Sequence, residues 1–235
     1  ERAPNHPGVF HYVIHAYDHP PLAAKAERFA AGYDAIAPEV PHALHMPSHI
    51  FVRLGRWEEG AEWNRRSAAA ALDQPMKGGV VSNHYPHAID YLVYSLLQSG
   101  HVEEAQRHVA DLLATPRIED SFGSAYALTA SPARLMLERE DWAGAAALPE
   151  TPHDSISWNR FPQAVAITWF AKGLGSVRSG DEAGTGAALS QLNRLQEIMD
   201  ERGLGYWVAL ADAQIGTIEA WRAFENGDTE VAIKR

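Results

Sequence analysis

The sequence predicts an all-α protein built from repeated helix pairs, and three observations lead to this prediction. A motif of two histidines four residues apart occurs at His11 and His15 and again at His45 and His49, with a shift of 34 residues. A glycine followed five residues later by a small residue recurs between stretches whose apolar residues have helical spacing. No stretch shows the apolar–polar alternation that is typical of a strand.

The shift of 34 residues indicates the type of helix pair. Pro7 and Pro41, which stand just ahead of the two histidine pairs, are also 34 residues apart. A fixed period of about 34 residues is the signature of tetratricopeptide (TPR) units, each of which is a helix–turn–helix. We therefore predict a single TPR-type domain over residues 1–235, an α-solenoid in which about eleven or twelve antiparallel helices form a right-handed superhelix.

The first predicted unit begins at a helix start and contains two helices. Asn5 is a capping residue and Pro7 follows in the first turn, so a helix is expected over 7–18. Two consecutive prolines, at 20 and 21, stop that helix, and a second helix is expected over 22–36. All six units are expected at approximately 7–40, 41–74, 86–119, 126–150, 158–201 and 205–235.

The second unit carries the second histidine pair on its first helix, which should run from Pro41 to about Leu54. Pro47 lies inside this helix and removes one backbone N–H, so it should bend the helix. Gly55 then provides a tight turn, and Gly60 places a small residue where two helices touch.

The later units repeat this pattern after a looser segment over 73–82, which is expected to be an inserted loop. Gly100 and Ala105 stand in the same relation as the two glycines of the second unit. The fourth unit is weaker, with a helix over 126–140. Helices are expected after it at about 160–178, 182–201 and 207–224.

Composition narrows the classes of partner. The chain has 30 acidic and 20 basic side chains, a formal net charge of −10, and no run of lysine and arginine. This argues against nucleic acid and against an anionic membrane surface as partners. There is no cysteine, which excludes disulfides and thiolate metal sites. No apolar run approaches the roughly 18 residues that a membrane-spanning helix needs.

The two ends of the chain suggest a piece of a longer protein. The sequence opens on Glu1 without a signal-like segment and closes on Arg235 within a helical pattern. We therefore expect missing repeats, and the cellular compartment stays open.

The segments around the histidine pairs resemble a family of bacterial TPR-containing proteins that carry paired H-x-x-x-H motifs in consecutive repeats. The similar segments are residues 6–15 and 41–50, followed by 90–94 and 134–139. Members of this family are longer and have further repeats ahead of this region. The resemblance covers nearly the whole chain and implies the solenoid fold, but it implies no particular activity.

Position within the units predicts which side chains share one surface. In TPR folds the first helix of each unit lines a concave groove, and its fifth and ninth positions generally face that groove. Counted from the first proline of each unit, His11, His45 and Asp90 are fifth. His15, His49 and Tyr94 are ninth, and His87 is second in its unit.

These side chains are predicted to form a metal site. The predicted ligands are His11, His15, His45, His49, His87 and Asp90, with Tyr94, His84 and Asp18 as groove-lining neighbours. The ring nitrogens of the four paired histidines should approach a common point, with His87 or Asp90 completing the shell. Imidazole with carboxylate suits zinc, iron, copper, nickel or manganese.

Other functions of the groove stay open at this point. It could hold a small acidic molecule beside one or two metal ions, or bind a peptide as a protein-interaction scaffold without a metal. A metal with three protein ligands and one open position could activate water. The sequence contains no catalytic motif such as a nucleophile elbow or a phosphate loop, so enzyme status is undecided.

Overall fold

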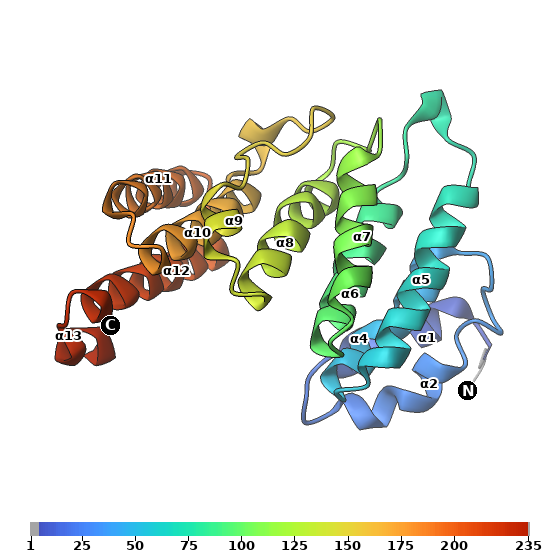
Figure 1. The fold of residues 1–235 in the computed structure, drawn as a ribbon. Coiled ribbons are helices and arrows are strands. Elements are labelled where there is room, and N and C mark those ends of the chain that lie inside the picture. The colour runs from blue at the N-terminus through green and yellow to red at the C-terminus, as the bar shows by residue number, and fades with distance from the viewer. Residues whose placement is uncertain (1–4, 235) are drawn as a thin grey trace. The chain divides into compact units, whose positions relative to one another are not determined.

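The computed structural model describes residues 5–234, and this part of the chain is all-helical, with 73% helix and no strands. The all-α prediction is therefore confirmed. The α-helices are α1 Pro7–Tyr17, α2 Glu27–Ala31, α3 Pro41–His45, α4 Pro47–Arg53, α5 Trp57–Asp73, α6 His84–Gln98, α7 Val102–Ala114, α8 Phe122–Glu138, α9 Trp142–Ala146, α10 Pro162–Arg178, α11 Glu182–Glu201, α12 Gly205–Glu225 and α13 Thr229–Lys234. Three short 3-10 helices, η1 Ala23–Ala26, η2 Lys77–Gly79 and η3 Trp158–Arg160, lie between them (Figure 1).

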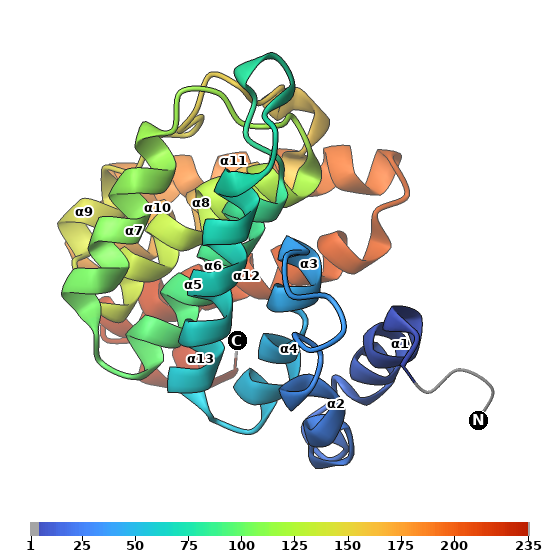
Figure 2. The ribbon, with the colours of Figure 1, turned by 90° about the vertical axis from the view of Figure 1, so that its right-hand side faces the viewer.

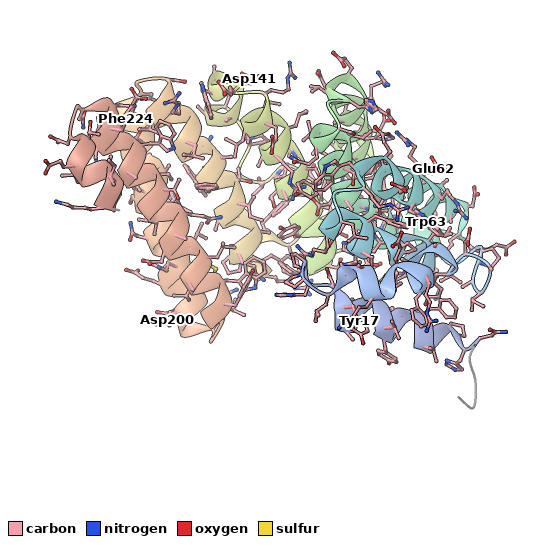
Figure 3. The ribbon with its side chains drawn as sticks, turned by 90° about the horizontal axis from the view of Figure 1, so that it is seen from below. Tyr17, Glu62, Trp63, Asp141, Asp200 and Phe224 are labelled. Atoms are coloured by element: carbon pink, nitrogen blue, oxygen red, sulfur yellow. The ribbon has the colours of Figure 1, made fainter. Side chains whose placement is uncertain are left out.

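The chain divides into two compact units, Glu1–Ala127 and Leu128–Arg235, with the boundary inside α8. In the first unit α5 packs against α3, α4 and α6, and α6 packs against α7 (Figure 1). α1 packs against α2 and α4. The buried core beneath these helices includes Ile14, Ile50, Phe51 and Trp63. Figure 3 labels Trp63 on α5 and Tyr17 at the end of α1.

One type of backbone turn ends six of the helices. In each, a residue in the left-handed conformation follows the helix, and the next N–H bonds back to the carbonyl five residues earlier. The left-handed residues are Gly55 (φ 69°), Gly100 (φ 79°), Glu140 (φ 54°), Gly180 (φ 73°), Gly203 (φ 69°) and Gly227 (φ 86°). The hydrogen bonds run from the N–H groups of Arg56, His101, Asp141, Asp181, Leu204 and Asp228 to the carbonyls of Phe51, Leu96, Met136, Ser176, Met199 and Ala223, at 2.8–2.9 Å. The predicted turn glycines thus occupy the conformation for which glycine is preferred.

The small residue at Gly60 lies where α5 approaches α6. A Cβ atom at this position would be 2.9 Å from the hydroxyl oxygen of Ser95 on α6, closer than side chains normally pack. The sequence pattern predicted a helix contact at this residue, and the structure confirms it.

The predicted helix over 22–36 is wrong, because the structure breaks it into η1 and the five-residue α2. Gly32 caps α2, and turns follow it up to the next unit. The predicted bend at Pro47 is confirmed: α3 ends at His45 and α4 begins at Pro47, with Met46 between them. Over 73–82 the loop contains η2 and one parallel β-bridge between Val81 and Ile118.

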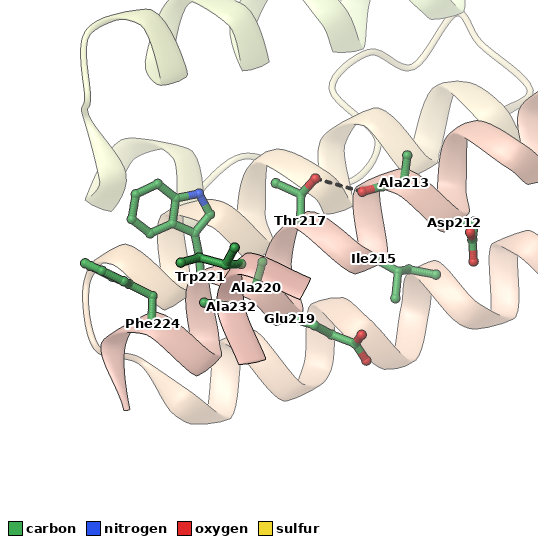
Figure 4. Close-up of a pocket in the computed structure, with 11 residues that line it drawn as sticks. Asp212, Ala213, Ile215, Thr217, Glu219, Ala220, Trp221, Phe224 and Ala232 are labelled. Carbon is green, nitrogen blue, oxygen red and sulfur yellow. Dashed lines mark hydrogen bonds between the residues drawn. The ribbon is translucent and has the colours of Figure 1, made fainter. Parts of the chain in front are cut away.

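In the second unit α10 packs against α9, α11 and α12, and α12 packs against α13. Its core includes Trp169, Leu192, Met199 and Ile218. A hollow of about 690 Å³ lies along α12 and α13 and is lined largely by apolar side chains such as Trp221 (Figure 4). Along residues 5–234, no helix combines the length and the apolar character needed to cross a bilayer.

Candidate metal centre

Seven histidines form a continuous cluster in the first unit. They come from four helices: α1 carries His11 and His15, α3 carries His42 and His45, α4 carries His49, and α6 carries His84 and His87. α4 contacts α1, and α3 contacts α4 and α6 (Figure 2). Neighbouring ring centroids are 4.7 Å apart for His11–His15, 5.2 Å for His11–His42, 5.8 Å for His42–His84, 4.9 Å for His45–His49 and 4.2 Å for His45–His87.

Six of these rings form two groups of three. The first triad is His11, His15 and His42, and the second triad is His45, His49 and His87. Within each triad, one nitrogen from each ring lies within 4.8 Å of the others. In the first triad, His11 Nε2 and His42 Nε2 are 3.1 Å apart.

In the second triad, the tautomer of His45 is fixed by a buried amide. Asn64 of α5 donates its side-chain N–H to the carbonyl of Gly60, at 2.8 Å, and a carbonyl can only accept. The amide oxygen of Asn64 therefore faces His45 Nδ1, at 2.8 Å. Because that oxygen also only accepts, His45 carries its proton on Nδ1, and its Nε2 presents a lone pair.

The tautomer of His49 is fixed in the same way by a carboxylate. Its Nδ1 lies 2.9 Å from Asp18 Oδ2, while Arg53 Nε donates to the other oxygen at 2.7 Å. Burial would raise the pKa of Asp18, but hydrogen bonds from His49 and Arg53 outweigh it and hold the pKa at about 2. The ionised carboxylate accepts a hydrogen bond from His49 Nδ1, so in its neutral form His49 would also present a lone pair on Nε2.

The two lone pairs face each other. His45 Nε2 and His49 Nε2 are 3.0 Å apart, a distance at which two lone pairs repel unless a cation lies between them. Two nitrogens bound at about 2.0–2.1 Å to one metal ion are about 2.9 Å apart at a right angle and about 3.3 Å apart at a tetrahedral angle. The observed separations of 3.0 and 3.1 Å in the two triads match those of ligands on one ion.

The environment of four of the rings favours their neutral form. His45 is buried, with 1% of its surface exposed. Burial, followed by the neighbouring His87 and His49, lowers its pKa well below the usual value. Burial and the histidines around it lower the pKa of His42 to about 4. Burial also lowers the pKa of His87, and the partial burial of His15 lowers the pKa of that ring. Neutral imidazole is the form that binds metals.

The structure distributes the predicted site residues differently from the single point that we expected. The four paired histidines do not share one site: His11 and His15 belong to the first triad, and His45 and His49 belong to the second. His87 completes the second triad. Asp90 lies outside both triads, buried on α6, where its charge raises the pKa of His87 against the effect of burial.

The predicted groove-lining residues have three different surroundings. Asp18 orients His49. The ring of His84 lies 5.8 Å from that of His42. Tyr94 packs edge-on against Trp57, with ring centroids 5.5 Å apart. Tyr91, which was not predicted, lies against the rings of His45 and His49 at 4.7 and 5.0 Å.

Sequence reasoning also missed His42 and Asn64. A signal for His42 existed: it follows Pro41 immediately, as His87 follows Pro86, so both hold the second position of their units. Asn64 gave no such signal, because it lies on the second helix of its unit.

Comparison of the chain with models of known protein families finds no match, and comparison with curated proteins finds no significant relative. The function of the histidine cluster is therefore inferred from its geometry.

Proposed function

We propose that the first unit is a metal-binding domain whose two histidine triads each hold one transition-metal ion. The observation that carries this proposal is the pair of Nε2 lone pairs of His45 and His49, 3.0 Å apart, with both Nδ1 protons engaged elsewhere. A shared proton is the other cation that could lie between them. A proton bridges two nitrogens, whereas here the nitrogen of His87 converges as a third donor.

The donor set indicates the class of metal. Each triad offers three imidazoles, and no carboxylate is among the six grouped side chains. Imidazole suits zinc, copper, iron and nickel, whereas carboxylate and carbonyl oxygens suit magnesium, calcium and manganese. We therefore favour zinc, copper, iron or nickel over manganese.

The surrounding fold is proposed to be a TPR-type solenoid related to the bacterial family with paired H-x-x-x-H motifs. Two features support this: the 34-residue shift between the histidine pairs, and one type of turn that recurs after α4, α6, α8, α10, α11 and α12. In such a fold the cluster would lie in a concave groove, where a peptide or a small acidic molecule could reach the metal.

The test is metal content after purification and equilibration with zinc, followed by dialysis. About two zinc ions per chain are expected, and His87→Ala and His15→Ala should each remove one. His101→Ala is the matched control, because His101 lies outside both triads. At a free zinc concentration one hundred times Kd, each bound ion should raise the free energy of unfolding of the wild type by about 2.7 kcal/mol. A folded protein that retains no zinc would refute the proposal and favour a metal-free peptide-binding scaffold.

A further inference from the structure

We infer that the two triads form one dinuclear centre, in which a small anion bridges the two metal ions. This inference rests on the proposed metal-binding function and specifies what the loaded centre binds. It follows from the adjacency of the triads, from their open coordination positions and from the balance of charge around them.

The triads are in contact through their rings. The centroids of His15 and His49 are 5.5 Å apart, and those of His42 and His45 are 6.1 Å apart. Each of these pairs joins one triad to the other. Two ions held by these rings would therefore be neighbours within one cluster, and not independent sites on separate surfaces.

Each ion would also keep an open position. Three nitrogens leave one position of a tetrahedral ion for an exogenous ligand, as in catalytic zinc sites. His15 is exposed to solvent, whereas His45 is buried. An anion can therefore reach the centre from the side of the first triad, while the second triad lies deeper in the unit.

The positive charge of two bound metal ions would favour binding of an anion. Six neutral imidazoles contribute no charge, whereas two divalent ions would bring four positive charges. The carboxylates that act on the ligands are Asp18, hydrogen-bonded to His49, and Asp90, beside His87. Arg53, which is hydrogen-bonded to Asp18, adds one positive charge. Together these side chains offset about a quarter of the metal charge, and a bridging anion such as hydroxide or azide would offset more. The anion would displace water bound to the metal ions, and no bond in the protein would be broken.

The test uses copper(II) as the probe metal and azide as the probe anion. With two copper ions per chain, electron paramagnetic resonance should detect less than a tenth of the copper as uncoupled spins once azide is added, because a bridged pair is magnetically coupled. His15→Ala should bind one copper ion and show it fully as an uncoupled spin. Its affinity for azide should fall at least tenfold, since only one metal remains.

Two further variants serve as controls. His101→Ala should behave as wild type. His11→Ala removes a different ligand of the first triad and should have the same effect as His15→Ala, so it replaces His15→Ala if that variant does not fold. Two copper ions per chain that stay uncoupled with azide would overturn the inference and leave the proposed metal sites in place. One copper ion per wild-type chain would also overturn it. Copper-free protein would refute both proposals.

Discussion

The hydrogen bond from His49 to Asp18 gives the sharpest prediction, because a single isosteric change tests whether the second triad is oriented for a metal. Asp18→Asn keeps the shape of the side chain but removes its negative charge. In the wild type, the two carboxylate oxygens accept hydrogen bonds from His49 Nδ1 at 2.9 Å and from Arg53 Nε at 2.7 Å. An amide offers only one accepting oxygen for these two donors. His49 would then lose either its fixed tautomer or its orientation.

The expected loss is about 10- to 100-fold in metal affinity, or about 1.4–2.7 kcal/mol, as is typical when a partner of a metal-bound histidine is removed. The assay is competition for zinc against a chromophoric chelator, in a His15→Ala background so that only the second triad binds. Asp34→Asn is the matched control, because Asp34 pairs with Arg66 at 2.9 Å and makes no contact with the histidine cluster. An affinity within twofold of the parent, or an equal loss in Asp34→Asn, would refute the reasoning.

Three further predictions test the fold, the protonation of the cluster and the charge of the chain. Glu140→Gly should raise the free energy of unfolding by about 1 kcal/mol, because Glu140 has a left-handed backbone conformation (φ 54°). Gly100→Ala should lower the free energy of unfolding for the same reason (φ 79°). Urea titration measures both changes. His42 has a pKa of about 4 when folded and near 6.5 when unfolded, so the unfolded metal-free chain binds the extra proton between these values. Stability should therefore fall as pH drops from about 6.5 to 4, less steeply in His42→Gln; an equal slope would contradict this. With a net charge of −10, the protein should not shift labelled DNA or RNA at physiological salt, and a salt-sensitive shift would contradict this.

The sequence was informative where a property depends on covalent spacing along one helix. A four-residue spacing places His11 beside His15 and His45 beside His49, and the rings are in contact in the structure, with centroids 4.7 and 4.9 Å apart. The turn glycines at 55 and 100 were predictable for the same reason, since a local conformation requires them.

The division into two triads could not be predicted, because it depends on how helices are rotated against one another. The bend between α3 and α4 was expected from Pro47, but its direction was not. The contact of Asn64 with His45 depends on the packing of α5 against α3, which no local pattern specifies. The short α2 was missed because apolar residues keep helical spacing across 22–36, whereas Gly32 and the turns after it end the helix early.

The bend at Met46 has a consequence for a chain that has no cysteine. The second triad takes its donors from α3, α4 and α6, so a bound ion would join three helices and close a loop of 42 residues between His45 and His87. A cross-link of that loop length reduces the entropy of the unfolded chain by the equivalent of about 4 kcal/mol. The ion would thus cross-link the chain as a disulfide does. A chelator would remove this cross-link, just as a reducing agent cleaves a disulfide. Because every triad ligand belongs to the first unit, chelation should lower the melting temperature of that unit.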